Sequence, residues 1–316
     1  MKMKSRILIL GATGYVGRSL VARLARSDWA QPVAGVRRAA DFGDVPTVRC
    51  EATDATALGA ALRDVDGVVS CVAGPASVMA AHAEALARAL AATQAPPRLV
   101  FLSSMAVYGD AVGLVDEAWP LSGEGDYGQA KVAAENTLAG VEDAVVLRPG
   151  CIFGPKSPQW TERIARLLVA RRLGDLGAMG DGCSNLVFVD DVTAAIEAAL
   201  RRPRDAASRA FNLAMPDAPR WNDYFMAFGE QLGAVPVPRI PGWRMRMETR
   251  LLAPPLKVLE IVAARLGRRG GVPPPIPPSL LRLWGQDIRL DVSKATHGLG
   301  VRWTPLDEGL RRAAAV

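Results

Sequence analysis

Short, continuously apolar runs alternate with helical patterns through the first 150 residues. The apolar runs predict strands at Arg6–Leu10, Pro32–Val36, Thr47–Arg49, Gly67–Cys71, Arg98–Ser103 and Ala144–Leu147. The segments between them predict helices at Tyr15–Arg26, Ala55–Arg63, Val78–Ala92 and Gly128–Leu138. Strands without polar alternation are buried on both faces, and alternating strands and helices form right-handed crossovers. The pattern therefore predicts an α/β fold built on a doubly wound parallel sheet.

Beyond residue 150 the pattern returns once and then changes. A strand at Asn185–Val189, a helix at Asp191–Arg201 and a strand at Ala210–Ala214 are expected to belong to the same layer, with Asp190 or Asp191 capping the helix. Residues 151–184 and 215–316 contain more proline, arginine and tryptophan, which predicts a smaller C-terminal substrate-binding lobe. The Rossmann domain would then comprise residues 1–150 together with 185–214. The proline-rich stretch Gly270–Pro278 is expected to be a turn or extended connector.

Composition excludes several classes of protein. Of the 316 residues, 50% are apolar and 22% are charged, which argues against a disordered, collagenous or coiled-coil chain. The four cysteines form no C-x-x-C pair and there are only two histidines, so neither a disulfide scaffold nor a zinc site is expected, and no metal. Neither a signal-peptide core nor a membrane-spanning run is visible, so a cytoplasmic protein without an integral membrane segment is expected.

The net charge of +6 is unevenly distributed. Residues 239–312 contain 14 Lys and Arg against 6 Asp and Glu. A solvated basic surface explains this, as does attraction of a phosphorylated cofactor, an acidic substrate or an anionic membrane surface. No nucleic-acid partner is expected, because aromatic side chains are not interleaved with the basic ones.

A glycine-rich segment directly follows the first strand and opens the first helix. It reads Gly11, Ala12, Thr13, Gly14, Tyr15, Val16, Gly17. Gly11 permits a tight turn, Gly14 lets the backbone approach a diphosphate, and Gly17 lets the helix pack closely on the strand. This placement predicts a dinucleotide site.

The second strand ends in Arg37 and Arg38. An arginine at this point suits the 2′-phosphate of NADP, whereas an acidic residue would suit the ribose of NAD. Two surface arginines are the alternative interpretation. Glu51, just beyond the third strand, is placed to contact the adenine, although it could equally face solvent.

Tyr127 and Lys131 lie four residues apart on a predicted helix and so share a face. An ammonium near the phenol, together with a positively charged nicotinamide, would lower its pKa toward the working range of a general base. Upstream, Ser103 and Ser104 follow the fifth strand, where a hydroxyl can hold a substrate carbonyl oxygen. A structural tyrosine, a solvated lysine and serines that cap backbone groups are the alternatives.

Together these motifs resemble the extended short-chain dehydrogenase/reductases, in their NAD-dependent epimerase/dehydratase branch. The resemblance extends to Leu147–Pro155, Val187–Val192 and the C-terminal Asp291–Pro305, and leaves about residues 235–285 unmatched. It implies a catalytic triad at Ser104, Tyr127 and Lys131, in which Tyr127 exchanges the hydroxyl proton. The implied cofactor contacts are Gly11, Thr13, Gly14, Tyr15, Val16, Gly17, Arg37, Arg38, Glu51, Ala52, Val72, Ala73, Ser103, Tyr127, Lys131, Pro149, Gly150 and Ile152.

Departures from the family pattern narrow the function. Sugar dehydratases carry an acidic pair after the catalytic hydroxyl residue, where this chain has Met105 and Ala106. Nucleotide-sugar epimerases usually carry an arginine where this chain reads Cys183-Ser184-Asn185, and Tyr in place of Phe153. These differences favour an NADP(H)-dependent reductase of a ketone or aldehyde, or the reverse alcohol dehydrogenase, acting on a small-molecule substrate. A nucleotide-sugar epimerase with tightly bound NAD is the alternative, and a non-catalytic NADP-binding sensor or assembly protein is a lesser one.

Two expectations concern surfaces. Residues 240–278 are dense in apolar side chains flanked by arginines, which fits a helix packed on the lobe, a cover over a hydrophobic substrate, or a membrane-surface helix. Family relatives often dimerise through the helices predicted here at Val78–Ala92 and Gly128–Leu138, so a homodimer is compatible with the sequence.

Overall fold

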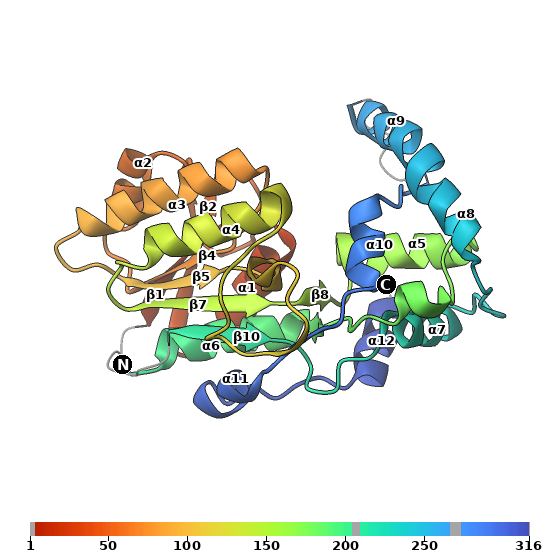
Figure 1. Cartoon of the computed structure of the whole chain (residues 1–316). Helices are drawn as coiled ribbons and strands as arrows, with labels where there is room; N and C mark the ends of the chain where they lie inside the picture. The colour runs from red at the N-terminus through yellow and green to blue at the C-terminus, as the bar shows by residue number, and fades with distance from the viewer. Residues whose placement is uncertain (1–3, 204–208, 266–272, 316) are drawn as a thin grey trace.

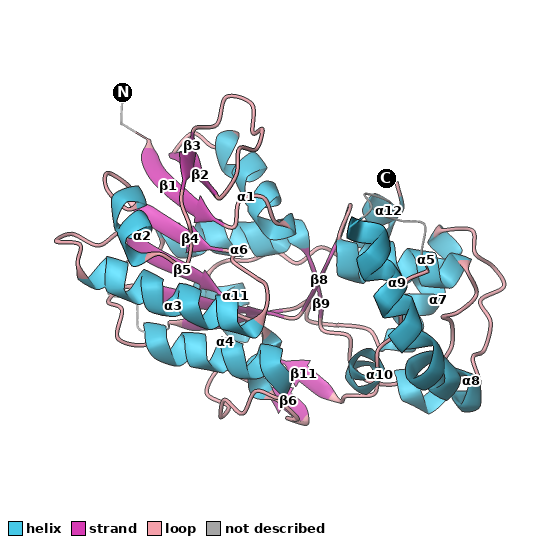
Figure 2. Cartoon of the chain, turned by 90° about the horizontal axis from the view of Figure 1, so that it is seen from above, coloured by secondary structure: helices cyan, strands magenta, loops and turns pink. Residues whose placement is uncertain are grey.

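A seven-stranded, wholly parallel sheet forms the larger part of the molecule. The computed structural model describes residues 4–203, 209–265 and 273–315. The sheet strands are β1 (Ser5–Leu10), β2 (Ala30–Val36), β3 (Thr47–Arg49), β4 (Gly67–Ser70), β5 (Arg98–Leu102), β7 (Ala144–Pro149) and β10 (Ala210–Leu213). Their order, β10-β7-β5-β4-β1-β2-β3, reverses direction between β1 and β4 (Figure 2). This is the predicted doubly wound, Rossmann-type sheet, and its carboxyl edge is where such folds bind ligands.

Helices cover both faces of the sheet because successive strand residues point in opposite directions. Ile7 and Ile9 pack against one layer, whereas Leu8 and Leu10 pack against the other. The first layer contains α1 (Tyr15–Ala25), α6 (Val189–Arg201) and the short α11 (Ser293–Gly298). The second contains α2 (Ala55–Ala61), α3 (Ala76–Ala91) and α4 (Gly125–Leu138). The apolar strands are thus buried on both sides, as their sequence predicts.

A separate aromatic core builds the smaller lobe, which lies beside the sheet in Figure 1. Its helices are α5 (Arg163–Val169), α7 (Trp221–Gln231), α8 (Gly242–Met247), α9 (Ala253–Arg265), α10 (Pro278–Trp284) and α12 (Leu306–Ala314). Trp221, Tyr224, Phe225 and Phe228 recur with helical spacing along α7 and are fully buried. Short helical segments η2 (Pro158–Glu162), η3 (Gly177–Gly180) and η4 (Glu248–Leu252) connect the lobe helices.

Two expectations about the returning segment are wrong. The strand predicted at 185–189 forms as β9 (Leu186–Phe188), but it pairs with β8 (Cys151–Phe153) in a separate small sheet. The helix that follows begins at Val189, so Asp190 and Asp191 lie in its first turn and Phe188 occupies the N-cap position. Asp191 instead accepts hydrogen bonds from the backbone and side chain of Thr304.

The proline-rich stretch is described only in part. Residues 273–277 have no helix or strand, and α10 begins at Pro278. Residues 270–272 of the predicted connector lie outside the described part of the chain.

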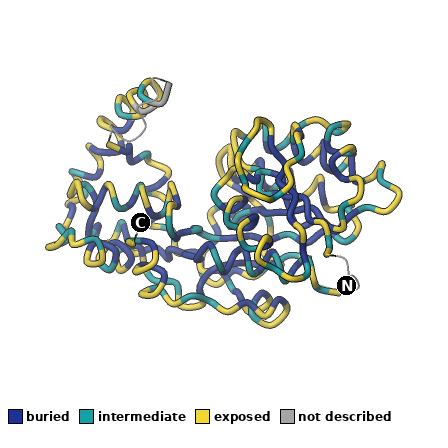
Figure 3. The backbone as a smooth tube through the Cα atoms, turned by 180° about the vertical axis from the view of Figure 1, so that it is seen from behind, coloured by how far each residue is buried: buried dark blue, intermediate teal, exposed yellow. Residues whose placement is uncertain are grey.

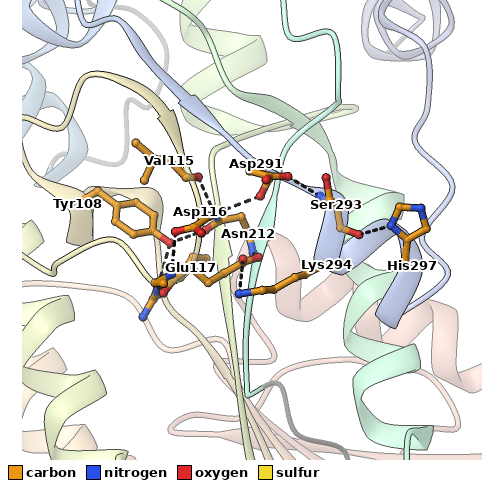
Figure 4. A network of polar contacts seen from close by, with 11 residues as sticks. Tyr108, Val115, Asp116, Glu117, Asn212, Asp291, Ser293, Lys294 and His297 are labelled. Atoms are coloured by element: carbon orange, nitrogen blue, oxygen red, sulfur yellow. Dashed lines mark hydrogen bonds and ion pairs between the residues drawn. The ribbon is translucent and has the colours of Figure 1, made fainter.

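The C-terminal segment joins both halves of the molecule. Strand β11 (Ile288–Leu290) pairs with β6 (Gly113–Val115), and buried polar contacts hold the chain that follows. Asn212 on β10 accepts from the Tyr108 hydroxyl at 2.6 Å and donates to the Asp291 carbonyl at 3.2 Å (Figure 4). The Lys294 ammonium lies 3.1 Å from the buried Glu117 carboxylate. The segment then packs α11 on the sheet and α12 on the lobe.

Candidate active site

A cavity of about 1460 Å³ lies along the carboxyl edge of the sheet and reaches the smaller lobe. Its sheet side is formed by the segments that follow β1, β2, β3, β4, β5 and β7. Its lobe side is formed by η2 and α10. The position is the crevice beside the point where the strand order reverses, which is the ligand-binding position of doubly wound sheets.

The glycine-rich turn after β1 forms one end of this cavity. Gly11 adopts φ +76°, and a Cβ there would lie 2.8 Å from the Cys71 carbonyl. A Cβ at Gly17 would lie 2.2 Å from the Gly11 oxygen, so α1 packs on the turn only because residue 17 is glycine. Gly11, Thr13, Gly14, Tyr15 and Val16 line the cavity, and Gly17 is not among its lining residues. The N-terminus of the 11-residue helix α1 opens there, which fits a diphosphate.

The ends of β2 and β3 form the next part of the wall. Arg37 and Arg38 are exposed side chains that line the cavity. Glu51 and Ala52 also line it. The Glu51 carboxylate accepts from the Thr53 hydroxyl at 3.3 Å, a contact that leaves its other oxygen available.

A buried histidine behind this wall was not identified from the sequence. His82 on α3 lies 2.7 Å from the Ser70 hydroxyl and 2.7 Å from the Ala52 carbonyl oxygen through its two ring nitrogens. Burial lowers the pKa of His82, which favours the neutral ring. The histidine therefore ties the Ala52 loop to β4. The sequence signal that indicates such a role for His82 is its position as a polar residue within the apolar stripe of the predicted helix Val78–Ala92.

Tyr127 and Ser104 meet at the centre of the cavity wall. The Ser104 hydroxyl lies beside the Tyr127 phenol, and the Ser104 oxygen accepts from the Ala106 amide at 3.2 Å. Helix α4 begins at Gly125, earlier than the predicted Gly128, so Tyr127 lies in its first turn. Burial raises the pKa of the Tyr127 phenol, and the neighbouring Ser104 hydroxyl opposes that rise. The phenol is therefore a proton donor at neutral pH.

Lys131 is buried and lines the same cavity. Its ammonium donates to the Leu102 carbonyl at the end of β5, at 2.8 Å. Burial lowers the pKa of Lys131 to about 8. Lys131 was expected to lower the pKa of Tyr127. In the structure, burial is the largest influence on the pKa of this phenol and raises it, and the Lys131 ammonium donates to a backbone carbonyl instead.

The lowered pKa of Lys131 makes a testable statement about stability. Its ordinary pKa is 10.5, so between pH 8 and 10.5 the unfolded chain holds a proton that the folded chain has lost. Stability rises with pH wherever the unfolded chain binds more protons. We expect the unfolding free energy of the nucleotide-free wild type, relative to Lys131→Met, to rise by about 3 kcal/mol across this window. Urea denaturation of both proteins at several pH values measures it, and a constant difference would contradict it.

Ser103 differs from its neighbour in where its hydroxyl points. Ser103 lines the cavity, but its hydroxyl donates to the Glu135 carboxylate at 2.5 Å. Glu135 forms a buried ion pair with Arg148 at 2.7 Å, and Arg148 donates to the Tyr108 hydroxyl at 2.9 Å. Of the two adjacent serines, Ser104 is thus the one directed to Tyr127. No local sequence pattern indicates this buried network, because its members lie on four separate elements or loops.

The remaining predicted cofactor residues also lie along the cavity. Val72 and Ala73 follow β4, while Pro149, Gly150 and Ile152 lie at the end of β7 and on β8. The positions that distinguish this chain from sugar enzymes separate into two groups. Met105 and Ala106 line the cavity. Cys183, Ser184 and Asn185 are buried, and the Asn185 amide bonds to the backbone of Ile288 and Leu290.

The lobe side of the cavity was missed by sequence reasoning. Trp160 on η2 and Leu283 on α10 supply apolar surface there. Arg282 lines the cavity with its guanidinium 3.5 Å from the Glu124 carboxylate, which belongs to the loop before α4. Gln286 donates to the Gly109 carbonyl at 2.6 Å. Gly109, Glu124 and Trp160 lie far in sequence from residues 282–286. No spacing links the two groups, and the fold brings them together.

The part of the chain that the structure describes lacks two further kinds of feature. No helix among them is long and apolar enough to cross a bilayer. In the same residues, no group of three or more His, Cys, Asp or Glu side chains could hold a metal ion.

Solved structures share the fold of this chain, and a curated protein matches part of its sequence. The curated protein YeeZ of Escherichia coli strain K12 is 29% identical over 143 residues, which cover 44% of this chain and 48% of YeeZ, so the match spans about half of that relative. Human epimerase family protein SDR39U1, solved with NADPH, superposes with a TM-score of 0.70 at 18% identity, covering 98% of both chains. UDP-glucuronic acid 4-epimerase from Bacillus cereus, solved with UDP-glucuronic acid and NAD, superposes with a TM-score of 0.72 at 17% identity, also covering 98% of both chains.

At these identities the two structures show a shared fold. The family assignment rests on a separate match, between residues 7–214 and the profile of the NAD dependent epimerase/dehydratase family. That match covers the glycine-rich turn, Ser104, Tyr127 and Lys131, as well as β10. The chain therefore belongs to the NAD dependent epimerase/dehydratase family, whose members are extended short-chain dehydrogenases/reductases.

Proposed function

We propose that this protein is an NADP(H)-dependent oxidoreductase that reduces a ketone or aldehyde, or oxidises the corresponding alcohol. The observation that carries the proposal is that Ser104, Tyr127 and Lys131 line one cavity with the glycine-rich turn. Met105 and Ala106 follow the serine, so the wall there lacks the acid and base that expulsion of water requires.

The chain's own groups account for the proton and for the position of the substrate. A bound nicotinamide would supply or accept the hydride at the carbonyl carbon. Ser104 holds the carbonyl oxygen, and the Tyr127 phenol gives that oxygen its proton in reduction or takes it back in oxidation. Lys131, anchored on the Leu102 carbonyl, supplies positive charge next to the end of β5.

The lobe side of the cavity indicates the chemistry of the substrate. Trp160, Leu280 and Leu283 present apolar surface, and Arg282 presents one cation. Such a wall fits a partly apolar molecule of small to medium size. A screen of ketones and aldehydes that follows NADPH oxidation is therefore the first search for the substrate.

Arg37 and Arg38 are the basis for the choice of NADP. Within the described part of the chain, neither guanidinium makes a hydrogen bond or an ion pair, and both line the cavity. We expect Arg37→Ala to weaken NADPH binding roughly tenfold or more, because a charge-assisted hydrogen bond contributes about 1.5–3 kcal/mol. NADH binding should change little. Titration calorimetry with both nucleotides tests this, with Arg38→Ala as the matched variant, and an equal loss for NADH would contradict it.

Nucleotide-sugar epimerisation with tightly bound NAD is the second candidate. It is favoured by Arg282, a cavity cation that could pair with a substrate phosphate, and by the epimerase fold of structural relatives. Denaturing the purified protein and identifying any released nucleotide separates the two functions. Near-stoichiometric NAD would favour the epimerase. A nucleotide-free protein that binds NADPH better than NADH would favour the reductase.

A further inference from the structure

A helical arm projects from the smaller lobe. It consists of α8, η4 and α9, residues 242–265, and in Figure 1 α9 extends away from the body of the molecule. Figure 3 shows mostly exposed backbone along this extension. Ala253 is buried where α9 begins, and from there to Ala263 no described residue is buried. The arm therefore leaves most of its surface uncovered.

The uncovered surface is strongly apolar. Val258, Leu259, Ile261 and Val262 of α9 are each 46–60% exposed. Their spacing places them on one side of the helix, because residues three and four positions apart are neighbours on a helical surface. Leu251 and Trp243 extend the exposed apolar surface toward the lobe, at 64% and 60%. Contiguous exposed apolar surface of this kind marks an interaction site.

Charge decides between the partners that an apolar surface could have. Residues 242–265 contain five Lys and Arg but only two Asp and Glu. One of the two acids, Glu248, is buried in an ion pair with Arg172 at 2.6 Å. Two copies of the arm packed against each other would bring cations together. An anionic bilayer instead offers an apolar interior and a negative surface at the same time.

We propose that the arm docks on the surface of an anionic phospholipid bilayer, with the apolar side of α9 in the interfacial layer. Arg246 and Arg250 are exposed on the same arm and attract the lipid headgroups. The arm lies on the bilayer and does not span it, since its helices are too short and too charged. This inference concerns a surface outside the cavity and stands independently of the proposed reaction.

Flotation of the full-length protein with vesicles tests the proposal. We expect recovery with vesicles of phosphatidylcholine mixed with phosphatidylglycerol, and about tenfold or greater loss of binding with phosphatidylcholine alone. Val258→Ser/Val262→Ser should weaken binding to the mixed vesicles by about tenfold or more, because it removes apolar groups from the interface. Arg246→Gln/Arg250→Gln should weaken it to a similar extent. Leu114→Ser, on β6, is the matched control and should bind like the wild type, because Leu114 is an equally exposed apolar residue outside the arm.

Two outcomes would overturn the proposal. One is wild-type protein that stays with the soluble fraction in the presence of mixed vesicles. The other is a Val258→Ser/Val262→Ser protein that floats as well as the wild type. Circular dichroism and NADPH binding of each variant confirm that it is folded. Sedimentation velocity identifies the competing partner, because a dimer that only this variant dissociates would assign the arm to a second copy.

Discussion

Tyr127→Phe is expected to lower kcat for the carbonyl substrate by about a thousand-fold, within the 10²–10⁴ range for loss of a general acid. The phenylalanine ring keeps the packing of the first turn of α4 but has no proton to give. Tyr127 lies beside Ser104, whereas the segments after β1, β2 and β3 would hold the diphosphate and the adenine. NADPH affinity should therefore change by less than about threefold. Steady-state kinetics and calorimetry on the same preparation measure both quantities, and undiminished turnover would refute the assignment of Tyr127.

The adjacent serines supply the matched control for this experiment. Ser104→Ala removes the hydroxyl beside Tyr127 and should lower kcat. Ser103→Ala removes a hydroxyl that bonds to Glu135, so its main effect should be on stability. A loss of kcat that is larger for Ser103→Ala than for Ser104→Ala would exchange the roles of the two residues.

Arg148→Met is expected to destabilise the protein by about 3–5 kcal/mol, the usual result of leaving one member of a buried ion pair uncompensated. Arg148 lies between the Glu135 carboxylate and the Tyr108 hydroxyl, and both it and Glu135 are buried. Arg148→Met/Glu135→Met should recover part of the loss, because the orphaned carboxylate is then gone. Urea denaturation of the wild type, the single variant and the double variant measures the free energy of unfolding of each protein.

An exposed ion pair supplies the control for the buried pair of Arg148 and Glu135. Arg88 and Glu84 on α3 form an i,i+4 ion pair at 3.7 Å in which both side chains are largely exposed. Arg88→Met should cost less than about 1 kcal/mol. If Arg148→Met lowered the free energy of unfolding by equally little, the buried network around Glu135 and Arg148 would not stabilise the fold.

The central sheet and one side of the cavity follow from local sequence patterns. Apolar runs and the glycine spacing are short-range signals, and parallel topology then places every strand's carboxyl end at one edge. Arg37 and Tyr127 could therefore be assigned to one site although 90 positions separate them in sequence. The partner of β9 could not be predicted in this way. Three apolar residues fit either sheet equally well, and in the structure Leu186 and Phe188 pack in the aromatic core of the lobe while Val187 packs in a core of the large sheet.

The lobe side of the cavity depends on contacts that no local pattern encodes. Arg282 meets Glu124, and Gln286 meets Gly109, across more than a hundred residues of chain. The direction of the Ser103 hydroxyl likewise depends on Glu135, a residue on α4. The exposure of α9 is a further case, because apolar residues at helical spacing usually pack on a core. A homodimer formed through α3 and α4 stays a prediction.

The path of the C-terminal segment limits how this protein can be recombined. Ala295 and Leu299 belong to the core on one face of the large sheet, whereas Leu310 belongs to the core of the lobe. The last 25 residues thus contribute side chains to the cores of both halves of the molecule, and neither half is a continuous stretch of the sequence. A chimera that exchanges the lobe with that of a relative must graft three separated stretches of chain, which contain α5, α7–α10 and α12, while keeping α11 with the sheet. A new substrate specificity in this architecture is therefore reached more easily through point changes at the cavity wall than through exchange of whole modules.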